Sequence, residues 1–406
     1  MLFRLKQNDS KSLMPRKYLC GRILLTSLAL CQATMPKTLG DDQELLAVIA
    51  KTGSQGGGSF AARVACDELV QRDVRFLPAL LTAMDTSNPV AANWYRTIFE
   101  EIVSREFQHD RTQWPTAFLK TYVSDRRRAG RPRRLVMRLI NRLEPDFQTS
   151  WLGGRLLDPE FRSEAVALTL KLGDEALVEN DVNAATVQFR KAFEHARDRQ
   201  QVLEAAKRLR SAGETADVVK QLGLVTDWWL TGPFDAPDRT GFELSFAPER
   251  GIDLQARYRG QSNRDFGWIR HQATDPLGQL NLVSTLGKAE NAVAYAWTEI
   301  TVDRAGDAQL RCGADDCCLV WLNDEVVSAH KQWLNGIRFD RFVNPVRLVK
   351  GRNRILVKVC QGPQHRNPEV SNYWSLQLRL CDHEGRGVPF ESALPGRETE
   401  SGPANQ

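Results

Sequence analysis

The spacing of apolar residues changes once along the chain, near residue 224, and this change most constrains the fold. Before it, apolar side chains recur every three to four positions, as at Phe189, Ala192, Phe193 and Ala196. This spacing is typical of a helix with one buried face. After it, apolar side chains occupy every second position, as at Trp374, Leu376, Leu378 and Leu380. Alternation of this kind predicts strands.

The two patterns predict a multidomain chain of mixed α and β structure. We expect an α-solenoid-like domain with HEAT-like and TPR-like helix pairs over residues 41–222. An antiparallel β-sandwich of jelly-roll type is expected over 224–392. The last residues, 393–406, contain Pro, Gly and Glu and are expected to be a disordered tail. Strands are expected at 225–231, 278–284, 292–297, 306–312, 317–322, 325–329, 343–348, 355–360 and 374–381.

The N-terminus has the pattern of a secretory signal peptide. Basic residues up to Arg22 precede a short apolar run over 23–31, and small residues follow. We assign the signal to residues 1–33, with Met14 as an alternative start. The run is too short to span a bilayer, which takes ~20 residues. The alternatives are lipidation of Cys31 and a buried N-terminal helix. We therefore expect a protein without a transmembrane segment, secreted or located in the periplasm or cell envelope.

The net charge of +5 is concentrated at the N-terminus. Residues 1–40 carry seven Lys or Arg and one Asp, so the rest of the chain is close to neutral. A neutral body gives no electrostatic reason to expect a nucleic-acid partner. An arginine cluster at 126–134 is the local exception. We expect acidic neighbours to pair with it; the alternative is contact with an anionic polysaccharide or a cell surface.

Several short motifs in the second half occur in a characteristic order. They are Asp-Trp-Trp-Leu-Thr-Gly-Pro-Phe-Asp at 227–235, Phe-Ala-Pro-Glu at 246–249, Gly-Ala-Asp-Asp at 313–316 and Val-Trp-Leu-Asn at 320–323. Together they resemble an uncharacterised planctomycete secreted family, which combines a HEAT-like α-helical domain with a galactose-binding-like (jelly-roll) β-sandwich. The resemblance implies this architecture and export, and no established activity. Cys317 and Asp324 stand where related sandwiches have Gly.

The candidate ligand-binding residues are Asp315, Asp316, Asn323 and Trp333. The Asp pair resembles a loop of protective-antigen-type sugar-binding domains, which implies calcium bound by Asp315 and Asp316, with Asn323 as a further ligand. The alternative is a solvated turn. Trp333, in a loop, is a candidate for stacking on sugar rings. We expect the other strand tryptophans, Trp297, Trp321 and Trp374, to lie in the core.

The sequence contains no P-loop, GxSxG or HExxH motif. We therefore expect an exported, non-catalytic binding or scaffold protein without a cofactor other than calcium. The sandwich would bind a polysaccharide or cell-surface glycan, and the helical domain would bind a protein. The alternatives are a structural cell-envelope component or a polysaccharide-acting hydrolase with dispersed carboxylates, for which the candidates are Asp235, Asp238, Glu249, Asp253 and Asp340. Six cysteines follow the signal, and their spacing leaves the disulfide pairing open.

Overall fold

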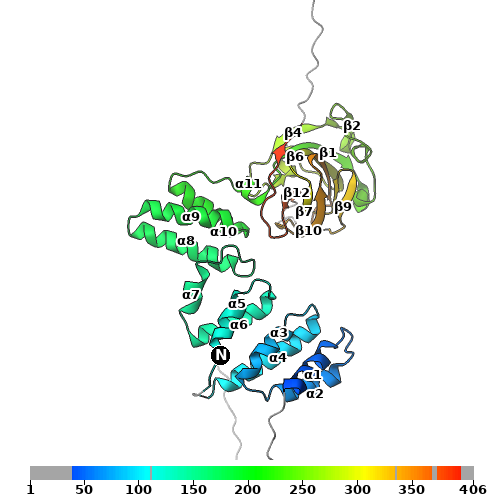
Figure 1. The fold of residues 1–406 in the computed structure, drawn as a ribbon. Coiled ribbons are helices and arrows are strands. Elements are labelled where there is room, and N and C mark those ends of the chain that lie inside the picture. The colour runs from blue at the N-terminus through cyan, green and yellow to red at the C-terminus, as the bar shows by residue number, and fades with distance from the viewer. Residues whose placement is uncertain (1–38, 110–111, 334–335, 368–372, 395–406) are drawn as a thin grey trace, which may run out of the picture. The chain divides into compact units, whose positions relative to one another are not determined.

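The structure, a computed structural model, describes residues 39–109, 112–333, 336–367 and 373–394. The predicted signal peptide and most of the predicted tail lie outside these residues. The chain divides into two compact units, one ending at Phe118 and the other beginning at Leu119. It contains helices and antiparallel sheets, as Figure 1 shows, so the predicted class of mixed α and β structure is confirmed.

The described residues of the first unit form helices and no strands. They are α1 (Leu39–Ala50), α2 (Ser59–Leu69), α3 (Leu77–Ala83) and α4 (Pro89–Glu106), after which α5 (Thr116–Ser124) spans the unit boundary. The start of α4 is fixed by Asn88, whose side chain accepts a hydrogen bond from the Val90 amide at 3.0 Å, and by a Pro at the first helical position. The same side chain donates to the Thr52 carbonyl at 2.8 Å, so one residue caps α4 and ties it to the end of α1.

The second unit begins with further helices. They are α6 (Gly130–Leu143), α7 (Phe147–Leu152), α8 (Arg162–Val178), α9 (Val182–His195), α10 (Arg199–Ser211) and α11 (Val218–Leu222). The apolar stripe of α9 buries Phe189 and Ala192 against α8 and α10. Four of the six arginines of the cluster pair with acidic side chains, as expected, and Arg127 and Arg128 share Asp125. Arg133 is buried with Asp158, at 3.1 Å between Nη1 and Oδ1, and Arg134 contacts Glu160 and Glu164.

Two antiparallel sheets follow the helices. The larger has the strand order β4-β1-β6-β11-β8-β9, with β13 also paired to β6, and the smaller has the order β10-β7-β12-β5. The larger sheet comprises β1 (Asp227–Asp235), β4 (Ile269–Gln272), β6 (Ala292–Val302), β8 (Cys318–Leu322), β9 (Glu325–His330), β11 (Gly351–Gln361) and β13 (Glu391–Ser392). The smaller comprises β5 (Leu280–Asn281), β7 (Gly306–Asp315), β10 (Phe342–Leu348) and β12 (Ser375–Cys381). A separate pair is formed by β2 (Arg257–Arg259) and β3 (Asp265–Gly267).

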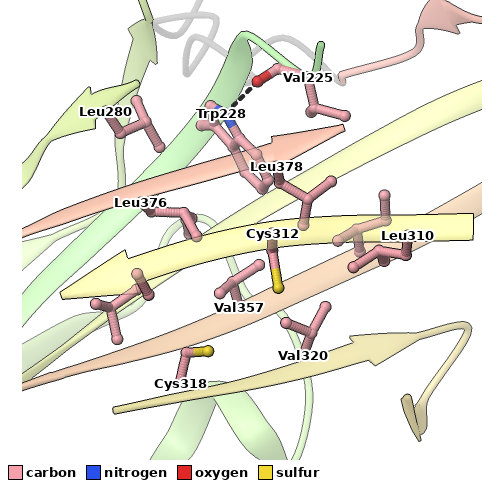
Figure 2. Packing of buried hydrophobic residues seen from close by; sticks show 14 of the residues in the cluster. Val225, Trp228, Leu280, Leu310, Cys312, Cys318, Val320, Val357, Leu376 and Leu378 are labelled. Carbon is pink, nitrogen blue, oxygen red and sulfur yellow. Dashed lines mark hydrogen bonds between the residues drawn. The ribbon is translucent and has the colours of Figure 1, made fainter. Parts of the chain in front are cut away.

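The sheets share one apolar core. Leu378 and Cys312 of the smaller sheet and Val357 and Val320 of the larger sheet belong to the same buried cluster, which Figure 2 shows. Trp228 lies in this core, where its indole nitrogen donates to the Val225 carbonyl at 3.1 Å. The six cysteines of the described residues are buried free thiols.

One predicted strand is mostly wrong. Only Leu280 and Asn281 of the segment 278–284 pair as a strand, and α12 (Leu282–Leu286) follows. The reason is local, because the Asn281 side chain accepts a hydrogen bond from the Ser284 amide at 3.1 Å and so caps a helix. Among the described residues, no helix has the length and apolar character needed to cross a membrane.

Candidate functional site

The outer face of the larger sheet carries a row of large apolar side chains, three of them tryptophans. Pairing places Trp229 opposite Trp297, Trp297 opposite Leu356, and Leu356 opposite Trp321, so the four residues share one face across β1, β6, β11 and β8. The connection between β1 and β4 covers part of this face with Phe246, Ile252 and other side chains, which gives the sheet a second apolar cluster.

A cavity of about 620 Å³ lies where this cover ends, and we call it the Trp297–Trp321 cavity. Its sheet residues are Trp297, Glu299, Trp321, Arg352, Arg354 and Leu356, and the turn residue Asp324 and the segment 248–254 complete the lining. Trp321 is partly exposed, whereas Trp297 is buried against the sheet. Arg352 approaches the Glu299 carboxylate at 3.9 Å, and Arg354 binds Asp324 at 2.5 Å. The cavity therefore combines flat apolar rings with charged hydrogen-bonding groups.

A buried ion pair holds Glu249 at the edge of this cavity. The Lys358 ammonium is 1% exposed and lies 2.8 Å from Glu249 Oε1, and it also donates to the Leu244 carbonyl. The Tyr295 hydroxyl donates to the same carboxylate. Burial would raise the pKa of Glu249, but the hydrogen bonds from Lys358 and Tyr295 outweigh it and lower the pKa. Glu249 is therefore held as a carboxylate, and the covering segment is anchored to β11 and β6.

The predicted Asp pair is buried. Asp315 ends β7, and the Asp316 side chain accepts a hydrogen bond from the Gly362 amide at 2.9 Å. Burial, together with the neighbouring Asp316 carboxyl group, raises the pKa of Asp315 to about 7. The pair is thus not the solvated turn that we gave as the alternative. In the part of the chain that the structure describes, no group of three or more His, Cys, Asp or Glu side chains could hold a metal ion.

The structure brings Trp333 to this pair and leaves Asn323 apart. Gly362 lies between Asp316 and the Trp333 ring, since an added β-carbon there would stand 3.0 Å from Asp316 Oδ2 and 3.3 Å from the indole. Trp333 is partly buried against the second apolar cluster. Asn323 follows the far end of β8, roughly 20 Å away at about 3.3 Å per residue, where its side chain accepts from the Arg354 amide at 2.9 Å.

Sequence reasoning missed the residues of the cavity for a physical reason. Trp297 is buried, as predicted, and Trp321 is partly buried, but both lie on the outer face of the larger sheet. Alternation along a strand predicts burial and does not indicate which face of the sheet a side chain joins. In this sheet both faces are covered, so the same pattern places a side chain in either cluster. Trp374, by contrast, does lie in the core between the sheets. Glu249 was among the candidate carboxylates, but Glu299 carried no signal because it sits inside an apolar strand.

Comparison with known proteins gives weak matches. No protein-family model matches the chain, and no curated protein matches it either. Among solved structures, a β-glucosidase from Kluyveromyces marxianus in complex with glucose is 15% identical over 31% of this chain and 15% of its own, with a TM-score of 0.23. A β-glucuronidase from an uncultured Clostridium sp. is 14% identical over 39% of this chain and 29% of its own, with a TM-score of 0.24. An α-xylosidase from Xanthomonas citri is 14% identical over 39% of this chain and 18% of its own, with a TM-score of 0.19.

These matches contradict the prediction that the chain is not an enzyme, because the proteins named are glycosidases, and we withdraw it. At these TM-scores the matches carry no argument about what this chain itself does, and it spans less than a third of each protein's length. They do not bear on the resemblance to planctomycete secreted proteins, which stays a prediction.

Proposed function

We propose that the chain binds carbohydrate in the Trp297–Trp321 cavity. The observation that carries this proposal is the combination of two indole rings with Glu299 and Arg354 in one cavity. Indole faces pack against the C–H faces of pyranose rings, and charged groups form the stronger hydrogen bonds to sugar hydroxyls. The volume of about 620 Å³ lies in the usual range for small-molecule sites.

The test is a panel of polysaccharides and oligosaccharides titrated against the full chain and two tryptophan variants. Trp321→Ala should weaken binding by about tenfold or more, since one aromatic contact contributes ~1 kcal/mol beyond its buried area. Trp333→Ala is the matched control, because Trp333 is also partly buried but lies outside the cavity. Binding lost only in Trp333→Ala would place the site beside Asp316 and overturn the proposal. A folded protein that binds no glycan would overturn it too.

A second candidate, hydrolysis of a glycosidic bond, is favoured by one observation. Glu249 and Glu299 both line the cavity, and glycosidases use two carboxyl groups that flank the scissile bond. The lowered pKa of Glu249 suits a nucleophile or base. Glu299 is the candidate for the acid, because the other carboxyl group of the cavity, Asp324, is paired with Arg354. Release of reducing ends from a bound polysaccharide, lost in Glu299→Gln with binding retained, would establish this activity. Unchanged release in that variant would reject it.

We also propose the finer architecture that the sequence suggests. Residues 41–222 would form a helical repeat scaffold that contacts a protein, and 224–392 a jelly-roll sandwich, in a chain exported after loss of residues 1–33. N-terminal sequencing of protein recovered from an exporting host tests the last point. A mature chain that begins near Thr34 supports export, and one that begins at Met1 or Met14 rejects it.

A further inference from the structure

The outer face of the smaller sheet buries an amide group that has no hydrogen-bond partner. Gln377 of β12 is 2% exposed, and among the described residues neither its oxygen nor its nitrogen has a partner. A buried polar group without a partner costs about 1–3 kcal/mol, so native structures rarely leave one without a bound molecule. Ser375 lies two residues away on the same face, and its hydroxyl is also buried without a partner.

Gln377 lines a cavity of about 370 Å³, which we call the Gln377 cavity. The other lining residues are Arg199, Leu277, Gln279, Ile337, Arg338 and Phe339. Arg199 is the first residue of α10 and lies over the Phe339 ring, at 5.6 Å from its centroid. The cavity is thus formed by the last long helix and by the outer face of the smaller sheet with the segment before β10.

The charge of the Gln377 cavity is positive. Two arginines line it and no carboxylate does. Within the part of the chain described, no ion pair involves Arg199 or Arg338, although most of the other cavity-lining arginines, such as Arg354, are paired. Two unpaired guanidinium groups at one opening favour an anionic ligand, which they can hold through charged hydrogen bonds.

The other lining residues of the cavity indicate which class of anion would bind. The Gln377 amide offers both a donor and an acceptor, so it is satisfied by a hydroxyl group and not by a bare oxyanion, which only accepts. Leu277, Ile337 and Phe339 supply apolar contact for a carbon skeleton. We propose that the Gln377 cavity binds a hydroxylated carboxylic acid of monosaccharide size, with the carboxylate at Arg199 and Arg338 and a hydroxyl group at Gln377. Uronic acids are the simplest sugars of this class.

The experiment titrates the full chain with D-galacturonate and D-glucuronate by calorimetry. The neutral parent sugars D-galactose and D-glucose serve as probes without the carboxylate, and sulfate serves as an anion without a carbon skeleton. The proposal expects a uronate to bind at least about tenfold more tightly than its parent sugar and than sulfate, the equivalent of one charged hydrogen bond. Equal binding of the parent sugar, stronger binding of sulfate, or no uronate binding would overturn it.

Variants locate the site. Arg338→Gln and Gln377→Leu should each weaken uronate binding by about tenfold, and the exposed Arg304→Gln is the matched control outside the cavity. Gln377→Leu should also unfold at a temperature no lower than the native protein, because it removes unpartnered polar atoms. If that variant fails to fold, Arg338→Gln and Arg199→Gln still test whether the uronate binds in this cavity. Both residues are exposed, so neither substitution should prevent folding. Unchanged binding in both would reject the site.

This inference stands apart from the proposed function. Trp321→Ala, which should lose glycan binding in the Trp297–Trp321 cavity, should leave uronate binding in the Gln377 cavity unchanged. A uronate that is lost in Trp321→Ala and kept in Arg338→Gln would show that it occupies the Trp297–Trp321 cavity, which would overturn this inference and support the proposed function.

Discussion

At the scale of single residues, the buried charged side chains show most clearly what could not be predicted from the sequence. Lys358 and Glu249 tie the covering segment to the larger sheet, and neither could be paired with the other from sequence. Their positions are far apart in the chain, and a lysine in the middle of an apolar strand gives no indication of which carboxylate will reach it. The Asp315–Asp316 pair was visible in the sequence, but its burial depends on how the chain packs around it.

Removing the cation from the buried pair should destabilise the protein strongly. Lys358→Met leaves the Glu249 carboxylate, whose side chain is 15% exposed, without its cation. We expect a loss of roughly 3 kcal/mol in the free energy of unfolding at pH 7. In the native protein the lowered pKa of Glu249 stabilises the fold above its ordinary pKa of 4.5, and this contribution is lost as the pH falls through the folded-state pKa.

Urea unfolding at pH 7 and pH 4 measures both effects. The gap between Lys358→Met and the native protein should narrow at pH 4, where the uncompensated carboxylate becomes protonated. The double variant Lys358→Met with Glu249→Gln should recover part of the loss at pH 7. A gap that is the same at both pH values would contradict the assigned pair.

Asp315 predicts the opposite dependence on pH. Its pKa is raised from 3.8 to about 7 in the folded protein, so the unfolded chain ionises first and stability falls as the pH rises between these values. Asp315→Asn removes this penalty and should increase the free energy of unfolding at pH 8 by about 2 kcal/mol, after allowance for solvent screening. Denaturant titrations at pH 5 and pH 8 measure whether the free energy of unfolding rises more at pH 8 than at pH 5. The exposed Asp307→Asn serves as the control. A gain of equal size in that control would contradict a role for burial.

At the scale of elements, strand positions were predictable and their partners were not. The segments 306–312, 317–322, 325–329, 343–348, 355–360 and 374–381 all coincide with observed strands, because alternation and turn residues are local signals. The very short β2, β3, β4 and β13 were missed, since two to four residues carry no period. The assignment of β11 and β12 to different sheets depends on long-range packing, which a local pattern does not contain.

The turn between β8 and β9 gives a prediction at this scale. Asn323 and Asp324 have φ values of 52° and 71°, which L-residues adopt at a cost and Gly adopts freely. Asp324→Gly should therefore raise the free energy of unfolding by about 0.5–1 kcal/mol, because the exposed ion pair with Arg354 contributes little. Asp324→Ala, which removes the same ion pair but keeps a β-carbon, should lower it. Denaturant midpoints that rise in both variants would contradict the turn assignment.

At the scale of the whole molecule, the chain divides into two compact units. We expect calorimetry to resolve two unfolding transitions. Ile98→Ala, in the core of the first unit, should lower only one transition, and Leu378→Ala, in the core of the second, only the other. Each substitution should cost about 2–5 kcal/mol. A single transition lowered by both variants would show that the units unfold together.

The double cover of the larger sheet has a consequence for the exchange of backbone hydrogens with solvent. β6 and β11 lie at its centre, paired on both edges and packed between two apolar clusters. Their amide protons can reach solvent only when both layers and the neighbouring strands open together. In deuterated buffer, the amides of Ala294, Ala296, Val357 and Val359 should therefore be the last of the second unit to exchange, at a rate set by its global unfolding.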